Sequence, residues 1–192
     1  MQQKNKEIIK ILLSNKTKEW NINQIAKASK TDYKTTYTII KRLTKNKIIE
    51  LKPFGKSNKV EIKNFHPIIF EVECERRKEL LKNKNLILFL DYFKSFQTRL
   101  YILLIFGSYA KGTQNKSSDL DIMFIYPDAD DRFENKILNI TKTIPLNIHI
   151  HLFKESEFIA MKNSNTLTVG QEAISNNIIL YGIEPYYELI KW

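Results

Sequence analysis

The sequence has a single cysteine, Cys74, among its 192 residues. Because there is no second cysteine, an intrachain disulfide is excluded, and we expect the reducing environment of the cytoplasm. Long apolar runs are also missing: the longest, residues 100–106, is far below the about 20 residues that a transmembrane helix needs. The N-terminal residues MQQKNKEIIK lack the apolar core of a signal peptide. The sequence therefore predicts a cytoplasmic protein without a membrane partner.

Negative charge is scarce in one part of the chain only. Residues 1–64 hold 16 Lys and Arg against 5 Asp and Glu, a net charge of +11, whereas residues 65–192 hold 15 against 16, a net charge of −1. A lysine-rich composition caused by a biased genome is the alternative explanation, but it should raise Lys throughout the chain. The segregation instead favours one module that binds a polyanion and a second that does not.

The most informative motif is GSYAKGTQNKSSDLD, residues 107–121. Its Gly-Ser pair follows the apolar run 100–106, which predicts a buried strand, and its end alternates polar with apolar residues as a second strand. The period of two places Asp119 and Asp121 on one face of that strand. Two carboxylates suit Mg²⁺ that bridges substrate phosphates. Gly107 and Ser108 could offer backbone N–H groups and a hydroxyl to those phosphates.

This motif resembles that of the nucleotidyltransferase superfamily that includes DNA polymerase beta, in particular the minimal nucleotidyltransferases of archaea and bacteria. The matching segments are Phe106-Gly107-Ser108 and Asp119-Leu120-Asp121-Ile122, with Ala110, Gly112 and Ser118 between them. The resemblance implies that Asp119 and Asp121 are catalytic and bind the metal, and that Gly107, Ser108 and Lys111 bind a nucleoside triphosphate. It also implies Mg²⁺ as the cofactor, with Mn²⁺ as an alternative.

One position departs from the family pattern. Active members carry a third carboxylate on the strand after the Asp-x-Asp strand, but residues 146–153 offer Asn147, His149 and His151 there. A histidine can accept a proton, yet it is a poor ligand for Mg²⁺, and Mn²⁺ or Zn²⁺ would tolerate it better. These side chains could equally be polar residues on a solvated strand face. Catalytic turnover therefore stays an open question at this point.

The basic segment has three helical patterns followed by two strands, residues 48–52 and 59–63, joined by the turn PFGKSNK. This order resembles the winged helix-turn-helix family, which implies that the third helix enters the major groove of DNA and the hairpin lies along the backbone. The residues expected to contact phosphates or base edges are Lys34, Thr35, Tyr37, Thr38, Lys41, Lys56 and Lys59. The alternative is a domain of this fold that mediates protein contacts.

The predicted fold class is α+β in three parts. Residues 1–64 form a winged helix-turn-helix domain, and the glycine-free residues 65–97 form a helical connector of one broken helix or two, weakest at 82–85. Residues 98–192 form a nucleotidyltransferase-type mixed β-sheet flanked by helices. The C-terminal segment NNIILYGIEPYYELI also resembles that of small archaeal members of the superfamily.

Two functions from different classes follow. The first is an enzyme that transfers a nucleoside monophosphate, of the AMP type, to a hydroxyl of a protein or nucleic acid. The second is a DNA-binding regulator whose transferase-like domain senses a nucleotide or binds a partner without turnover. Because family members often act as antitoxins, the resemblance also implies a partner toxin protein as an alternative. Winged-helix regulators commonly dimerise, which makes a homodimer a further alternative.

Overall fold

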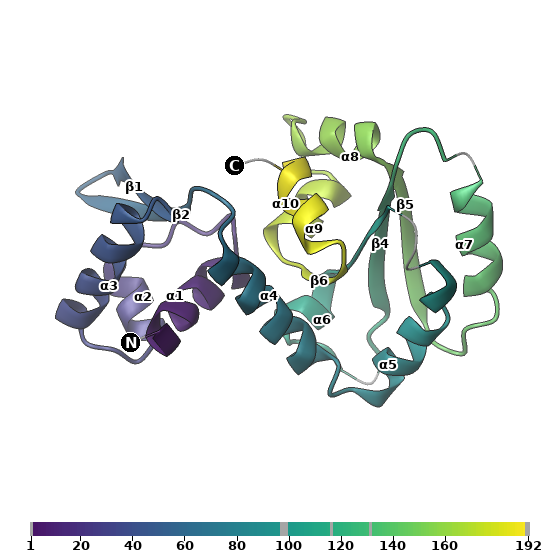
Figure 1. The fold of residues 1–192 in the computed structure, drawn as a ribbon, viewed down its shortest axis with the longest axis horizontal. Helices are drawn as coiled ribbons and strands as arrows, with labels where there is room; N and C mark the ends of the chain where they lie inside the picture. The colour runs from purple at the N-terminus through teal and green to yellow at the C-terminus, as the bar shows by residue number, and fades with distance from the viewer. Residues whose placement is uncertain (1, 97–99, 116, 131, 191–192) are drawn as a thin grey trace. The chain divides into compact units, whose positions relative to one another are not determined.

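The computed structural model describes residues 2–96, 100–115, 117–130 and 132–190 (Figure 1). The chain divides into two compact units, a first unit that ends at Cys74 and a second unit, Glu75–Ile190. The division falls within helix α4 (Pro67–Leu80). None of the helices in the described ranges is long and apolar enough to cross a membrane.

The first unit has three helices and a β-hairpin: α1 (Gln2–Ser14), α2 (Ile22–Ala28), α3 (Tyr33–Lys45), β1 (Ile49–Phe54) and β2 (Ser57–Ile62). Side chains cap the N-termini of α2 and α3. Asn21 forms a capping box with Gln24, and the Asp32 carboxylate accepts the Thr35 N–H. The apolar faces of the helices meet in a core with the hairpin, formed by Ile8, Ile9, Leu12, Leu13, Ile25, Ile40, Leu43 and Val60.

The hairpin turn is tighter than the sequence indicated. The strands pair from Ile49 with Ile62 to Phe54 with Ser57, which leaves a two-residue turn at Gly55 and Lys56. Gly55 has a φ of +56°, a conformation that favours glycine. The seven-residue connection predicted between the strands was therefore wrong, because most of its residues continue the strand ladder.

The second unit is built on a four-stranded sheet in the order β5-β4-β3-β6. Its strands are β3 (Ile102–Ile105), β4 (Leu120–Tyr126), β5 (Ile148–Lys154) and β6 (Ile178–Tyr181). The central strand β4 runs parallel to β5 and antiparallel to β3, and β3 is antiparallel to β6. The sheet is therefore mixed, as predicted, and β5 forms one of its edges.

Helices cover both faces of this sheet (Figure 1). They are α5 (Lys84–Asp91), α6 (Gly107–Lys111), α7 (Phe133–Thr141), α8 (Glu155–Lys162), α9 (Val169–Ser175) and α10 (Ile183–Ile190), together with the short 3₁₀ helix Lys94–Phe96. On one face, the alternating residues Leu120, Ile122 and Phe124 pack in a buried cluster with Phe89 of α5 and Phe133 of α7. The alternation predicted for the strand is thus explained by this core.

The predicted connector contains two helices, α4 and α5, separated at the expected weak segment, where Asn83 caps α5. Leu86 and Phe89 are buried in the second unit, so α5 is part of its core. The C-terminal turns of α4 are also attached to that unit, because Arg76 and Arg77 donate hydrogen bonds to the backbone carbonyls of Asn177 and Leu180. The predicted boundary at residues 97 and 98 lies outside the described residues.

Candidate functional site

The Gly-Ser turn lies directly against Asp121. The chain leaves β3 and enters α6 through Gly107, which has a φ of +64°. A Cβ atom at Gly107 would lie 2.1 Å from Oδ2 of Asp121, so the absence of a side chain is required there. The Phe106 N–H also donates to the Asp121 carbonyl over 3.1 Å. The structure therefore brings together two parts of the motif that are 14 positions apart in the sequence.

Two histidines adjoin the same carboxylate. The parallel register pairs Asp121 with His149 and Met123 with His151, which places both imidazoles on the face of the sheet that carries Asp121. Nδ1 of His149 is 3.5 Å from Oδ1 of Asp121, and the rings of His149 and His151 are 4.5 Å apart between centroids. Each of the three residues offers a ligand atom within 4.8 Å of the other two. We refer to Asp121, His149 and His151 as the Asp-His-His cluster.

The members of this cluster differ in their exposure. The Asp121 side chain is 27% exposed and that of His149 is 66% exposed. His151 is half-buried beside the Phe106 ring, at 5.3 Å between centroids. Burial lowers the pKa of His151, as does the neighbouring His149, while the carboxylates of Asp121 and Glu172 oppose the shift. The neutral imidazole, whose free nitrogen can bind a metal or accept a proton, is therefore favoured at this position.

Other residues predicted at this site surround the cluster without joining it. Asp119 is exposed just before β4 and, in the part of the chain that the structure describes, is not grouped with the cluster. Ser108 is half-buried in the first turn of α6. Lys111, at the end of α6, has Nζ 3.3 Å from a carboxylate oxygen of Glu172. Asn147 is exposed, and its carbonyl accepts the Leu120 N–H over 2.9 Å.

The donor set of the cluster can be tested against Mg²⁺. Mg²⁺ requires oxygen ligands in near-ideal octahedral geometry. The cluster offers one carboxylate and two imidazoles, so as a unit it does not fit this ion. Mg²⁺ at Asp121 would instead have to use Asp119 and phosphate oxygens. Sequence reasoning identified both histidines, but only the strand register shows that His149 stands directly beside Asp121.

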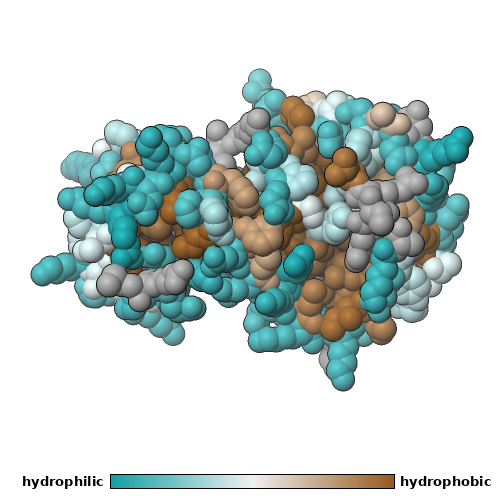
Figure 2. Space-filling model, viewed as in Figure 1, coloured by the Kyte–Doolittle hydropathy of each residue, from teal (hydrophilic) through white to brown (hydrophobic). Residues whose placement is uncertain are grey.

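The second candidate surface lies on α3. Tyr33 and Tyr37 stack at 6.1 Å between ring centroids, and their exposed fractions are 51% and 37%. Nζ of Lys41 is 5.0 Å from the Tyr37 ring. Both tyrosines line a cleft of about 330 Å³ that also includes Lys56 at the hairpin turn. Hydrophilic side chains predominate on the visible surface over α3 (Figure 2). Tyr33 was missed in the sequence, although its spacing of four from Tyr37 predicts the same helix face.

The other predicted residues of α3 gather in a second hollow. Lys34, Thr35 and Thr38 line about 260 Å³ together with Lys4 and Arg42. The Thr38 hydroxyl donates to the Lys34 carbonyl over 2.9 Å, which leaves the hydroxyl oxygen as an acceptor. Arg42 donates a hydrogen bond to the Asn5 side chain. Lys4 was missed because its distance of 30 positions from Lys34 hides their proximity in the sequence.

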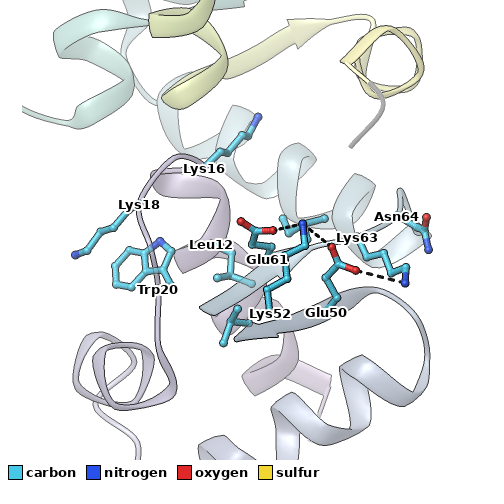
Figure 3. A pocket seen from close by; sticks show the side chains of 11 residues that line it. Leu12, Lys16, Lys18, Trp20, Glu50, Lys52, Glu61, Lys63 and Asn64 are labelled. Carbon is cyan, nitrogen blue, oxygen red and sulfur yellow. Dashed lines mark ion pairs between the residues drawn. The ribbon is translucent and has the colours of Figure 1, made fainter. Parts of the chain in front are cut away.

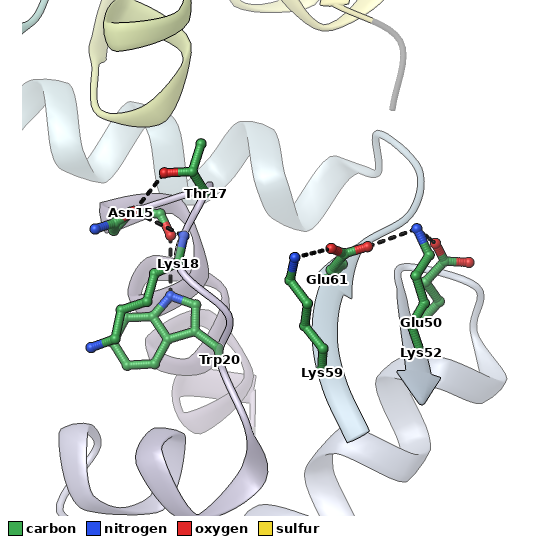
Figure 4. A network of polar contacts seen from close by, with 8 residues as sticks. All are labelled: Asn15, Thr17, Lys18, Trp20, Glu50, Lys52, Lys59 and Glu61. Carbon is green, nitrogen blue, oxygen red and sulfur yellow. Dashed lines mark hydrogen bonds and ion pairs between the residues drawn. The ribbon is translucent and has the colours of Figure 1, made fainter. Parts of the chain in front are cut away.

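Ion pairs on the hairpin reduce the positive charge available there. Nζ of Lys59 is 2.7 Å from Glu61, and Nζ of Lys52 is 2.7 Å from Glu61 and 3.0 Å from Glu50 (Figure 4). These carboxylates raise the pKa of Lys52, with Glu61 the larger cause. Lys59 is therefore partly neutralised, whereas Lys56 is exposed at the turn.

Glu50, Lys52 and Glu61 of these ion pairs also line a cavity of about 400 Å³ (Figure 3). Its apolar wall includes Leu12, Trp20 and Val60, and Lys16 and Lys18 add positive charge. Lys18 lies over the Trp20 ring with Nζ 3.9 Å from the centroid, and the indole N–H donates to the Asn15 carbonyl over 3.1 Å. The sequence contains no motif that predicts this cavity.

The match to a known family falls within the second unit. A family model described as "Polymerase beta, Nucleotidyltransferase" matches residues 90–185, half of the chain. No curated protein matches the chain. A candidate nucleotidyltransferase from Sulfolobus solfataricus, solved at 1.40 Å, is 19% identical with a TM-score of 0.36, over 58% of this chain and 88% of that one. A toxin-antitoxin structure with AMP-PNP is 22% identical with a TM-score of 0.35, and the match covers 57% of this chain and 81% of that one.

Proposed function

We propose a function from the premise that this chain belongs to the polymerase beta nucleotidyltransferase family: the second unit binds a nucleoside triphosphate with a divalent metal ion, and the first unit binds DNA. The observation that carries the nucleotide part is the contact between Gly107 and the Asp121 carboxylate. Phosphates bound at the Gly-Ser turn would lie beside a metal ion held by Asp121. A metal that bridges protein carboxylates and substrate phosphates needs this adjacency.

The residues at the turn would take separate roles. Gly107 and Ser108 would donate a backbone N–H and a hydroxyl to phosphate oxygens. Asp119 and Asp121 would hold Mg²⁺, with Mn²⁺ as the alternative, and the metal would neutralise phosphate charge. Lys111 would add a positive charge, in competition with its ion pair to Glu172. The reaction would be transfer of a nucleoside monophosphate, of the AMP type, to a hydroxyl of a protein or nucleic acid.

The histidines favour a second candidate, a protein that binds nucleotide without efficient turnover. The residue next to Asp121 in the parallel register is His149 and not a carboxylate. A carboxylate there would both hold the metal and take the proton from the attacking hydroxyl. Without it, the domain would serve as a nucleotide sensor or as a docking domain for a partner such as a toxin protein.

The DNA-binding proposal concerns a winged helix-turn-helix in the first unit. Its support is the order of α2, α3 and the β-hairpin, together with the net charge of +11 over residues 1–64. The third helix α3 would enter the major groove with Thr35, Tyr37 and Thr38 toward base edges. Phosphate contacts would come from Lys34, Lys41, Lys56 and, in part, Lys59. A homodimer would read two half-sites.

Calorimetry with a non-hydrolysable nucleoside triphosphate and Mg²⁺ tests the nucleotide site. We expect the double variant Asp119→Asn, Asp121→Asn to lose metal-dependent nucleotide binding, because the metal loses its carboxylate ligands. The variant should stay folded, because neighbouring carboxylates repel each other when no metal is bound and their neutralisation removes that repulsion. Asp91→Asn, whose carboxylate pairs with Lys94 on the surface, is the control and should bind normally. Equal affinity in parent and double variant would refute the site. Radiolabelled nucleotide transfer, measured on the same proteins, separates an enzyme from a sensor.

A further inference from the structure

The Asp-His-His cluster has the composition of a site for a borderline metal ion. We propose that Asp121, His149 and His151 bind one divalent transition-metal ion of the zinc class, in the absence of nucleotide and without Asp119. Imidazole nitrogens and a carboxylate oxygen are ligands that Zn²⁺ and its neighbours accept readily, whereas Mg²⁺ favours oxygen alone. The inference differs from the Mg²⁺ site above in its ligands and in its metal.

The distances in the cluster are close to those of a tetrahedral site. Bonds of about 2.0–2.1 Å to zinc place two ligand atoms about 3.3 Å apart. The Asp121 and His149 atoms are already 3.5 Å apart. The widest separation in the cluster is within 4.8 Å, so closure requires a shift of about 1.5 Å at most.

The surroundings of each ligand allow that closure. The Asp121 carboxylate occupies the space that the missing side chain of Gly107 leaves open, since a Cβ there would lie 2.1 Å from Oδ2. His151 is held between the rings of Phe106 and Phe153, with centroid distances of 5.3 and 6.4 Å. His149 is 66% exposed on the edge strand β5, and its ring can therefore reorient. A packed imidazole, an exposed imidazole and a carboxylate beside Gly107 can therefore enclose an ion.

Three protein ligands leave a coordination position open. Zinc sites of this type keep a water molecule or a substrate atom in that position. Here the open position would accept a phosphate oxygen, and this consequence alone rests on the proposed nucleotide site. Because Asp121 is common to both sites, bound Zn²⁺ would compete with Mg²⁺ for that carboxylate.

Metal binding by the full chain, purified without a histidine tag and stripped of metal, tests the proposal. We expect one equivalent of Zn²⁺ to bind in calorimetry, and Mg²⁺ to bind at least about 100-fold more weakly without nucleotide. Co²⁺ should give the intense visible absorption of a four-coordinate ion. The variants Asp121→Asn, His149→Ala and His151→Ala should each weaken Zn²⁺ binding by more than about 100-fold, since even residues behind the ligands contribute 10–100-fold.

Two control variants make the test specific. His66→Ala removes the remaining histidine of the three in the sequence and should leave Zn²⁺ affinity unchanged. Asp119→Asn should also leave Zn²⁺ affinity unchanged while it weakens Mg²⁺-dependent nucleotide binding. Circular dichroism of each variant establishes that it is folded. Zn²⁺ binding that survives in the folded His149→Ala, His151→Ala double variant would overturn the proposal, as would absence of Zn²⁺ binding by the parent.

The two proposals fail in different ways. If Zn²⁺ binding depends on the cluster but the protein binds no nucleotide in the presence of any of the metal ions, the proposed function is overturned and this inference stands. Nucleotide binding that depends on Asp119 and Asp121, combined with no Zn²⁺ binding, would do the reverse.

Discussion

A side chain at position 107 and the carboxylate of Asp121 cannot occupy the structure together, since a Cβ on Gly107 would lie 2.1 Å from Oδ2 and 3.0 Å from Cγ of Asp121. The same glycine has a φ of +64°, which other residues adopt only with strain. Glycine is therefore required here for two separate reasons, backbone conformation and space for the carboxylate.

Gly107→Ala should displace Asp121 and weaken metal binding by at least about tenfold, because the carboxylate must move out of a site shared with two histidines. Gly112→Ala is the matched control: Gly112 has a φ of +69°, but an added Cβ there meets nothing within 4 Å. Both variants should lose about 1–2 kcal/mol of stability from the left-handed backbone. Calorimetric metal titration and urea unfolding of the two proteins measure the difference. Equal metal affinity in both would contradict the clash.

Lys34→Ala and Lys41→Ala should each reduce the salt dependence of DNA binding. A lysine that contacts a phosphate releases a counterion, so its loss lowers the slope of log affinity against log salt by about 0.9. Lys10→Ala, an exposed change on α1, is the control and should leave the slope as in the parent. Fluorescence anisotropy with a labelled duplex at several salt concentrations gives the slope. An unchanged slope in a protein that carries both substitutions would mean that these lysines do not contact phosphate.

The buried Tyr101 side chain should make the stability of the fold fall at alkaline pH. It is 4% exposed, and burial raises the pKa of Tyr101 to about 12. In the unfolded chain the pKa is about 10, so between about pH 10 and about pH 12 the unfolded chain loses this proton while the folded chain keeps it. Stability then falls as pH rises, by up to about 1.4 kcal/mol per pH unit.

Tyr101→Phe removes this titration and isolates it from that of the lysines. The difference in unfolding free energy between parent and variant should be constant below about pH 9 and should shift in favour of the variant at higher pH. Urea unfolding across this range measures it. Parallel stability curves for the two proteins would show that folding does not raise the pKa of Tyr101.

Local patterns predicted much of the fold. The alternation of Leu120 and Ile122 with polar residues identified a strand, and both side chains lie in the buried core of the second unit. The helix α10, Ile183–Ile190, was not predicted. Pro185 lies in its first turn, where a missing N–H removes no intrahelical bond, and that placement cannot be distinguished from a loop by sequence alone.

The candidate site shows where sequence reasoning ends. The motif identified Gly107 and Asp121 because their types and spacing are specific. The sequence offered His149 and His151 as equivalent replacements for a third acid, since both lie on one face of a strand. Only the parallel pairing of β4 with β5 sets His149 opposite Asp121. Strand register depends on long-range contacts that a local pattern does not contain. The role of Asp119 stays a prediction.

Position 149 is where we expect a third carboxylate to restore transfer. Nδ1 of His149 is 3.5 Å from Oδ1 of Asp121, whereas His151 lies two residues farther along β5 beside Phe106. An aspartate at 149 would add an oxygen ligand for Mg²⁺ and a base for the attacking hydroxyl. The parent lacks both, and we therefore expect slow or absent transfer with Mg²⁺.

His149→Asp should raise Mg²⁺-dependent transfer of a radiolabelled nucleoside monophosphate over the parent, with general-base catalysis worth about 10²–10⁴-fold. His151→Asp is the matched variant and should give less gain, because position 151 pairs with Met123 in the strand register whereas position 149 pairs directly with Asp121. Adding Asp121→Asn to His149→Asp should remove the gain, which ties it to this site. A gain in His151→Asp alone would place the vacant position there. Robust transfer by the parent, abolished by Asp121→Asn, would show instead that a histidine suffices as the base and that the protein is an efficient enzyme as it stands.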